Sequence, residues 1–184
     1  MICLFSIQAW AQSGKLFNTD NQLSSNLATQ VFQDKSGFIW IATRNGLNTY
    51  DGYNITVMKK DMSNFLGLKS NYINSIAQDD KEHILLGTNN SLLEFTGSEF
   101  RKIPMLDSKG GELATYVKQV YPLKNKDVAV ATSGYGIMLK KQDEQKCHAM
   151  KGEVEKLKYI LKLLEDKRGR LWIITEDGKL YRKE

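Results

Sequence analysis

The sequence has few residues of the kinds that usually mark an enzyme or a cross-linked protein. Its 184 residues include two cysteines, two histidines and two prolines. It has no Walker loop and no Gly-x-Gly-x-x-Gly, His-Glu-x-x-His or Gly-x-Ser-x-Gly motif. It also has no run of about 20 apolar residues, so no segment is expected to span a membrane. These absences argue against the common nucleotide-dependent, zinc-dependent and serine-hydrolase classes, and we expect no catalytic activity in this chain.

The cysteines and histidines do not cluster in the sequence. Cys3 lies in residues 1–11, which we predict to be removed, and Cys147 then has no partner for an intrachain disulfide. Cys147 and His148 are neighbours, so on a strand they point to opposite faces and make a poor nucleophile–base pair; a loop or edge with a free thiol is expected. His83 falls in a predicted turn with no other His or Cys near it. We therefore expect no metal site and no cofactor.

The first residues indicate export. Residues 1–11 carry no charge, contain an apolar run and end in Ala9-Trp10-Ala11, which fits the small-x-small cleavage rule of secretory signal peptides. The basic start of such a peptide is missing and the apolar run is short, so the signal is partial or begins upstream; an ordinary N-terminal strand is the alternative. If the leader is removed, the exported chain begins near Gln12 with a lead-in segment over 12–22.

The net charge is positive but dispersed. The chain has 26 Lys and Arg against 21 Asp and Glu, which gives a formal net charge of +5. The basic residues are scattered among acidic ones, and the densest basic run, 166–170, falls in a predicted turn. Nucleic acid is therefore not an expected partner.

The most informative stretch, 38–53, predicts consecutive β-hairpins. Its apolar and β-branched runs, 38–43 and 47–50, are separated by Asn45-Gly46, and Asp51-Gly52 separates the second run from a third over 54–59. Asn-Gly and Asp-Gly between such runs are strong hairpin signals. With an inner strand over 27–33, these residues predict a four-stranded antiparallel unit.

The same pattern occurs three more times along the chain. Aligned on the threonine that ends the second strand, the copies place Thr43, Thr88, Thr132 and Thr175 at separations of 45, 44 and 43 residues. A period in the low forties suits one four-stranded blade of a β-propeller. The chain is therefore predicted to be all-β, with about four antiparallel blades of a partial propeller at about 23–66, 67–110, 111–153 and 154–184.

Several residues of the repeat have an expected structural role. Three copies have Asp nine residues before the threonine, where its carboxylate can accept backbone N–H groups of the turn. Trp40 and Trp172 are expected in the core between blades. The structural positions of the repeat are Asp34, Gly37, Trp40, Thr43, Gly46, Asp51, Gly52, Thr88, Thr132, Trp172 and Thr175.

The segment 153–166 gives conflicting signals. Its apolar residues recur at helical spacing, with no Pro or Gly among them. The repeat register instead predicts a strand from about Tyr159 to Leu164. We prefer the strand, because tertiary context overrides local propensity.

These features resemble the two-component regulator propeller repeat, which occurs in tandem in the extracytoplasmic sensor regions of hybrid two-component systems of Bacteroides-type bacteria. The resemblance is closest over 23–26, 33–43, 45–53 and 69–76, and it extends from Leu23 to Tyr181. It implies a periplasmic β-propeller sensor whose ligand is a glycan-derived oligosaccharide or another small periplasmic molecule.

The resemblance also implies partners that this chain does not contain. In that family an immunoglobulin-like domain, a membrane helix, a histidine kinase and often a receiver with a DNA-binding domain follow the propeller. The expected partners are thus the remaining blades and the kinase of the same parent protein, with a homodimer expected and membrane attachment only through a downstream segment. Four blades are fewer than a closed propeller of this family uses, so we expect a fragment or a truncated gene product.

Ligand-binding residues are expected in the turns after the aligned threonines, because loops on a rigid scaffold commonly carry binding residues. The candidates are Arg44, Asn45, Asn89, Asn90, Tyr135 and Glu176. For each of them, a purely structural role in the turn is the simpler alternative. Two other functions stay open: a propeller that only docks proteins or dimerises, and a lyase of the kind that some bacterial propellers with similar repeats form, which two isolated histidines argue against.

Overall fold

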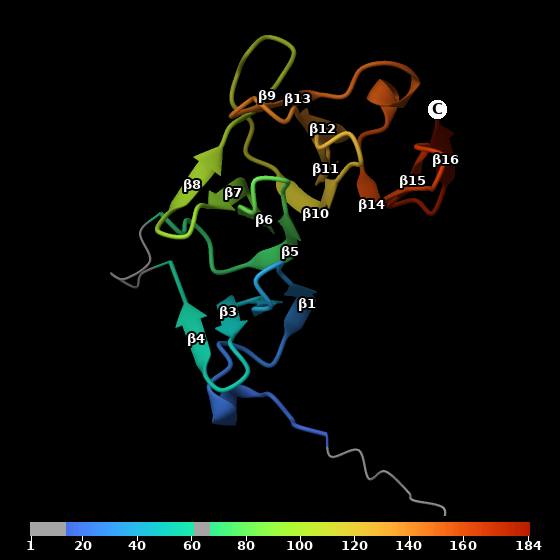
Figure 1. The fold of residues 1–184 in the computed structure, drawn as a ribbon. Coiled ribbons are helices and arrows are strands. Elements are labelled where there is room, and N and C mark those ends of the chain that lie inside the picture. Colours follow the sequence, from blue (N-terminus) through green and yellow to red (C-terminus); the bar gives the residue numbers. More distant parts are fainter. Residues whose placement is uncertain (1–13, 61–66) are drawn as a thin grey trace, which may run out of the picture.

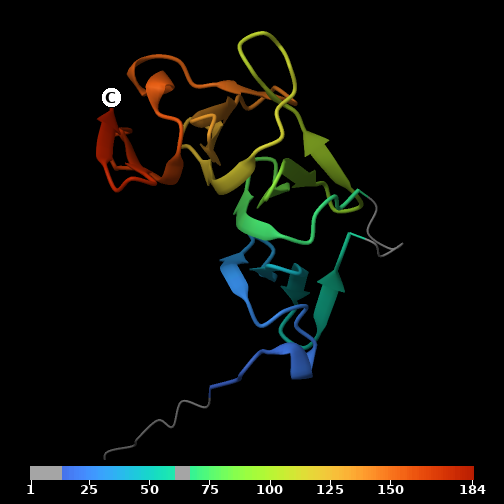
Figure 2. The same cartoon turned by 180° about the vertical axis from the view of Figure 1, so that it is seen from behind.

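The computed structural model describes residues 14–60 and 67–184. In these residues, sixteen strands form four sheets that follow one another in sequence order. Figures 1 and 2 show the sheets along an arc, with the first sheet (blue) at one end and the fourth (red) at the other. The predicted all-β class with propeller blades is confirmed, and the arc is open. The predicted leader, 1–11, lies outside the described residues.

The first two sheets are four-stranded meanders in which each strand pairs with the next. The first contains β1 (Ala28–Gln33), β2 (Ile39–Thr43), β3 (Gly46–Tyr50) and β4 (Ile55–Met58). The second contains β5 (Ile73–Gln78), β6 (Ile84–Thr88), β7 (Leu92–Phe95) and β8 (Phe100–Ile103). The strands predicted over 27–59 agree with the first sheet to within one residue at each end.

The third and fourth sheets depart from four strands. The third contains β10 (Tyr116–Pro122), β11 (Val128–Ser133), β12 (Ile137–Lys140) and β13 (Cys147–Ala149). A fifth strand, β9 (Met105–Leu106), belongs to the connection after the second sheet and pairs with β13 in parallel. The fourth sheet contains β14 (Ile160–Glu165), β15 (Leu171–Thr175) and β16 (Leu180–Lys183).

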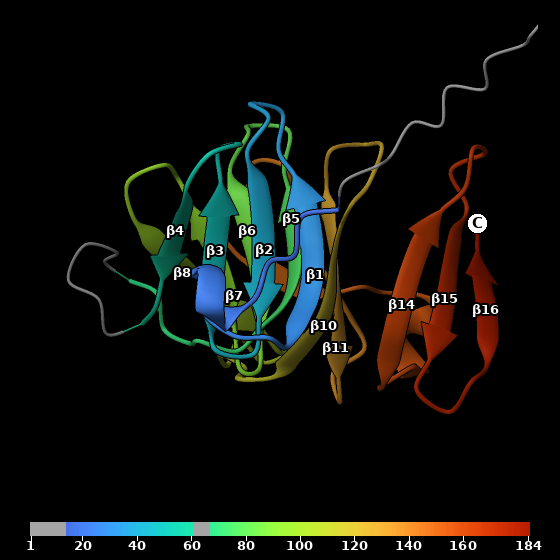
Figure 3. The same ribbon diagram turned by 90° about the horizontal axis from the view of Figure 1, so that it is seen from below.

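Two short 3-10 helices, η1 (Thr19–Asn21) and η2 (Glu153–Lys156), accompany the sheets. No helix among the described residues is long and apolar enough to cross a membrane. The lead-in containing η1 passes over the outer face of the first sheet (Figure 3). There, the Phe17 ring meets the Tyr50 ring at 5.1 Å, and just after the lead-in the Ser24 N–H donates to Asn48 Oδ1 at 2.8 Å. The lead-in therefore covers part of the face that no neighbouring sheet covers.

The apolar cores lie between successive sheets, so each sheet is stabilised mainly by its neighbours. The core between the first and second sheets includes Trp40, Ala42, Leu47, Leu86 and Leu93. The core between the second and third includes Leu85, Leu92, Val117, Val130 and Met138. The core between the third and fourth includes Ala129, Ala131, Ile160, Leu163 and Ile173.

The structure decides the conflict over 153–166 in favour of the predicted strand. Helix η2 takes a single turn, and β14 follows it. The helical spacing has a specific cause: pairing with β15 shifts between Ile160 and Lys162, so Ile160 and Leu163 face the same core although they are three residues apart. A β-bulge therefore imitates helical periodicity in the sequence.

Two predictions about individual residues are wrong. Leu171 and Ile173 face the third sheet, so Trp172 between them faces away; it is half-buried and outside the core, because no described strand packs on that face. Cys147 is not in a loop or at an edge: it lies in β13, between β12 and β9, and is fully buried. His148 is exposed, as its opposite orientation requires.

Candidate functional site

Each inner strand contains a β-bulge at the same place in its repeat. Pairing shifts between residues 28 and 30 in β1, 73 and 75 in β5, 117 and 119 in β10, and 160 and 162 in β14. A bulge leaves one residue unpaired and re-aims its side chain, and bulges are frequent beside functional sites. The residues released in this way are Thr29, Asn74, Lys118 and Leu161.

Side chains from the inner strands and the neighbouring turns form a continuous row across the four sheets. The Arg44 guanidinium carbon lies 5.6 Å from the centre of the Tyr72 ring, and the Tyr72 and Tyr116 rings meet edge to face at 6.1 Å. The Lys118 amine lies 4.6 Å from the centre of the Tyr116 ring and 3.2 Å from Glu176 Oε1. We call these five residues the Arg44–Glu176 row.

Hydrogen bonds between sheets fix the middle of the row. The Tyr116 hydroxyl donates to Asn74 Oδ1 at 2.8 Å, and Asn74 Nδ2 donates to the Val117 carbonyl at 3.0 Å. At one end, the Ser133 hydroxyl donates to Glu176 Oε1 at 2.9 Å. The row is therefore built on rigid strands, with its two charged ends on turns.

The row is also electrostatically connected. Burial raises the pKa of Tyr116 to about 12, and the neighbouring Tyr72 acts in the same direction. The positive charge of Arg44 lowers this pKa and the negative charge of Glu176 raises it, so both ends of the row act on its centre. Tyr116 keeps its proton at physiological pH and presents a neutral hydroxyl.

The structure brings Arg44 and Glu176 into one row but gives the other predicted residues separate surroundings. Asn89 Oδ1 accepts the hydroxyl of Ser70, from the segment before β5, at 2.8 Å, and Asn90 Oδ1 accepts the Thr88 hydroxyl of its own turn at 3.1 Å, so both amides are engaged within the second repeat. Asn45 is exposed in its turn. Tyr135, 45% exposed, lines a small hollow of about 150 Å³ on the third sheet.

The threonines that align the repeats shape these turns. Each is buried, and its hydroxyl donates across the turn to a backbone carbonyl: Thr43 to Gly46 at 2.8 Å, Thr88 to Ser91 at 2.9 Å and Thr132 to Gly136 at 2.7 Å. Gly46 has φ +133°, and a Cβ there would lie 2.9 Å from the Ser24 side chain, so glycine is required on two grounds.

A larger hollow lies elsewhere. It has a volume of about 730 Å³ and is lined by the turns after β10 and β14, together with Glu144 and His148. Successive turns of an antiparallel meander lie at opposite ends of its strands, so this hollow is at the edge opposite the turns with Arg44 and Glu176. None of the six predicted ligand-binding residues lines it.

Sequence reasoning missed Tyr72, Tyr116 and Lys118 as site residues. The two tyrosines occupy equivalent positions sixteen residues before Thr88 and Thr132, where they pass for core residues of the repeat. Both tyrosines are half-buried, and this could not be predicted from the sequence because it depends on the β-bulge that follows each of them. The signal that could have indicated these site residues is that tyrosine, and not an aliphatic residue, recurs at this position of the repeat.

Three segments match the family model described as two component regulator propeller: residues 22–45, 67–90 and 156–177. They fall in the first, second and fourth copies, so these three copies match the two-component regulator propeller repeat. A comparison with curated proteins gave no match.

Solved structures with similar folds include extracellular domains of hybrid two component systems of B. thetaiotaomicron. The BT4673 domain has a TM-score of 0.74 at 16% identity, and the BT3049 domain 0.63 at 22% identity; each match covers 85% of this chain and 23% of that chain. Virginiamycin B lyase from Staphylococcus aureus gives 0.61 at 10% identity over 85% of this chain and 55% of that chain. At these identities the likeness shows the propeller fold, and the chain spans about a quarter of the two extracellular domains.

Proposed function

We propose that this chain is part of an exported, periplasmic sensor region of a hybrid two-component system, and that it binds a glycan-derived oligosaccharide at the Arg44–Glu176 row. Ligand binding is relayed to a histidine kinase in another part of the parent protein. The repeat family and the shared fold support the sensor role. The row is the observation that carries the ligand site, because it is contiguous, polar and aromatic, and spans all four sheets.

The chemistry of the row suits a sugar. Tyrosine rings offer an apolar face and a polar tip, which match the C–H faces and hydroxyls of a pyranose. Arg44 and Lys118 supply only donors and Glu176 only acceptors, and the Tyr116 hydroxyl, whose proton is donated to Asn74 Oδ1, can accept. A row that crosses four sheets favours an extended oligosaccharide over a single sugar, because each unit can contact a different sheet. A ligand that bridges sheets can then shift how they are arranged.

The test is thermal unfolding of the 184-residue chain with a panel of plant and host oligosaccharides. A ligand that binds only the folded state raises the melting temperature. We expect Arg44→Ala and Lys118→Ala each to weaken binding by about tenfold or more, because a hydrogen bond to a charged group contributes roughly 1.5–3 kcal/mol.

Two controls distinguish the row from other surfaces. Arg101→Ala removes an exposed arginine that pairs with Glu99, and it should leave binding unchanged. His148→Ala changes the large hollow between the third and fourth sheets. If His148→Ala abolishes the stabilisation and the row variants keep it, the ligand site is the hollow and the proposal for the row is wrong.

A second candidate function is docking of another copy of the chain. The outward face of the fourth sheet exposes Leu164 (58%), Ile174 (40%) and Leu180 (61%) around Trp172. A contiguous exposed apolar surface of this kind is typical of an interaction site. Sedimentation of the chain and of Leu180→Asp tests this: a dimer that the substitution dissociates supports docking, and a monomer at all concentrations excludes it.

A further inference from the structure

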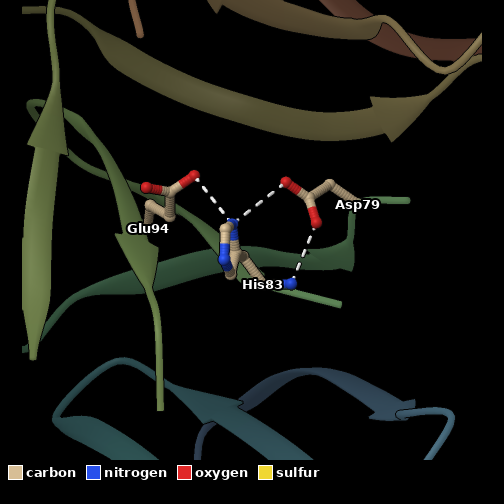
Figure 4. Close-up of side chains that lie close together, drawn as sticks. All are labelled: Asp79, His83 and Glu94. Carbon is tan, nitrogen blue, oxygen red and sulfur yellow. Dashed lines mark hydrogen bonds and ion pairs between the residues drawn. The ribbon is translucent and has the colours of Figure 1, made fainter. Parts of the chain in front are cut away.

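We propose that Asp79, His83 and Glu94 of the second sheet form a binding site for a divalent first-row transition-metal ion such as Zn²⁺. The three side chains point toward one another, with the His83 ring between the two carboxylates (Figure 4). His83 Nδ1 lies 3.5 Å from Asp79 Oδ2 and 3.3 Å from Glu94 Oε1, and the three ligand atoms lie within 4.8 Å of one another. This site is separate from the Arg44–Glu176 row.

These three side chains, which we call the trio, lie where two other repeats make a hydrogen bond between an aspartate and a tryptophan. In the first repeat, Asp34 Oδ2 accepts the Trp40 indole N–H at 2.7 Å, and in the fourth, Asp166 Oδ2 accepts that of Trp172 at 3.0 Å. The second repeat has Leu85 at the tryptophan position, so Asp79 Oδ2 has no indole to accept.

The rest of the Asp79 carboxylate is held as in those repeats. Asp79 Oδ1 accepts the backbone N–H groups of Lys81 and His83, both at 2.9 Å. The turn thus fixes the orientation of the carboxylate and leaves Oδ2 facing His83 and Glu94. Orientation of a ligand by hydrogen bonds to its other oxygen is the usual support of a metal site.

Glu94 points to a missing ligand. Glu94 is only 3% exposed, and in the described part of the chain neither Glu94 Oε1 nor His83 Nδ1 makes a hydrogen bond. A buried carboxylate without a hydrogen bond is costly; the contact with His83 offsets this cost as an ion pair only with a charged imidazole, whereas metal coordination offsets it with a neutral one. Arg101 lies directly across from Glu94 on β8, but it does not pair with Glu94, because its guanidinium donates to Glu99 instead.

The charge of the trio also favours a cation. Two buried carboxylates carry two negative charges, and a protonated imidazole supplies one positive charge. Lys140 is buried on the face of β12 turned to the second sheet, but no ion pair joins its amine to the trio. A divalent ion bound by a neutral imidazole would balance both carboxylates.

The spacing of the ligand atoms fits a tetrahedral ion. With zinc bonds of about 2.0–2.1 Å, neighbouring ligands of a tetrahedron lie about 3.3 Å apart. The two nitrogen–oxygen separations, 3.3 and 3.5 Å, match this edge. One imidazole among the ligands favours a transition metal over Mg²⁺ or Ca²⁺, which take oxygen ligands. Three protein ligands leave the fourth position for water or a group from a bound partner.

The test is Co²⁺ and Zn²⁺ binding by the tag-free 184-residue chain after treatment with a chelator. We expect one Co²⁺ per chain with visible d–d absorption and no thiolate charge-transfer band, and a higher melting temperature with Zn²⁺. His83→Gln and Glu94→Gln should each weaken Zn²⁺ binding by at least about tenfold, because each removes a ligand and even substitution of the residues that orient ligands costs about 10–100-fold.

The matched control is His148→Gln. His148 is the other histidine of the chain; it lies near one carboxylate instead of two, with its Nε2 3.6 Å from Glu144 Oε2, and its side chain is half exposed. This variant should bind Zn²⁺ like the wild type. No tight Zn²⁺ binding, unchanged binding in His83→Gln, or a thiolate band in the Co²⁺ spectrum would each overturn the proposal. If His83→Gln does not fold, the Co²⁺ spectrum of the wild-type chain still decides between nitrogen–oxygen ligands and sulfur.

Discussion

The second sheet packs so closely on the third at Gly87 that we predict a loss of stability when this residue is enlarged to alanine. A Cβ added to Gly87 would lie 2.5 Å from Val117 Cγ1 and 3.3 Å from Val120 Cγ2, and both valines are buried. Valine cannot move its methyls away cheaply, so Gly87→Ala must shift β6 relative to β10. The equivalent positions of the first and third repeats, Ala42 and Ala131, are small and fully buried as well.

The expected magnitude follows from two opposing contributions. Overpacking a close-packed interior costs about 1–3 kcal/mol. Replacing glycine by alanine at an ordinary φ recovers about 0.4–1 kcal/mol through the unfolded state. Gly87→Ala should therefore lower the free energy of unfolding by roughly 1.3 kcal/mol, the difference between the middle values of these two ranges. Urea denaturation monitored by tryptophan fluorescence measures this difference, and Gly14→Ala, where no atom lies within 4 Å, is the neutral control.

A double-mutant cycle separates the contact from general strand effects. Val117→Ala removes the methyl that the new Cβ would meet, so it should cost less in the Gly87→Ala chain than in the wild type, with a coupling of at least about 0.5 kcal/mol. If Gly87→Ala is neutral or stabilising, or if the two substitutions are additive, the close contact between the second and third sheets is wrong.

Three further substitutions or reactions test other contacts. Trp40→Phe loses the indole hydrogen bond to Asp34 and should lower the free energy of unfolding by about 1.5–3 kcal/mol in urea denaturation; a loss below about 0.5 kcal/mol would deny that bond a role. The Trp172 indole and Arg170 hold the pKa of Asp166 below its usual range. The contribution of the ionised Asp166 carboxylate to the free energy of unfolding is therefore complete above about pH 4 and is lost as the pH falls further. The destabilisation by D166N at pH 7 should thus shrink in acid, and a pH-independent difference would contradict this. Burial raises the pKa of Cys147 to about 12, so with the other cysteine removed its reaction with Ellman's reagent at pH 8 should follow unfolding; rapid reaction of the folded chain would refute burial.

The repeat could be predicted from the sequence because every blade needs the same local solutions. The threonine hydroxyl closes each turn, and Asp79 and Asp166 hold their turns by backbone N–H bonds as the pattern indicated. These interactions are local, so residue spacing reveals them. The same regularity favoured strand over helix in 160–165, where local periodicity alone pointed to a helix.

The site could be predicted only in part, because it depends on contacts between repeats. Arg44 and Glu176 were expected as separate turn residues. Tyr116 and Lys118 lie between them because of a β-bulge, and the sequence of one repeat does not indicate that bulge. The environment of His83 was missed for a similar reason. Besides Asp79, the acidic side chain within ion-pair distance of its ring is Glu94, which is eleven residues away on β7, so spacing gave no metal-ligand pattern.

The most direct test of oligosaccharide binding at the Arg44–Glu176 row is calorimetric titration of the most stabilising oligosaccharide into the wild-type chain and into a chain with R44A and K118A. We predict one site per wild-type chain, and a loss of affinity of about a hundredfold in the double variant if the two contacts are independent. Equal affinity for the two chains, or no binding heat with any oligosaccharide of the panel, would contradict the proposed site.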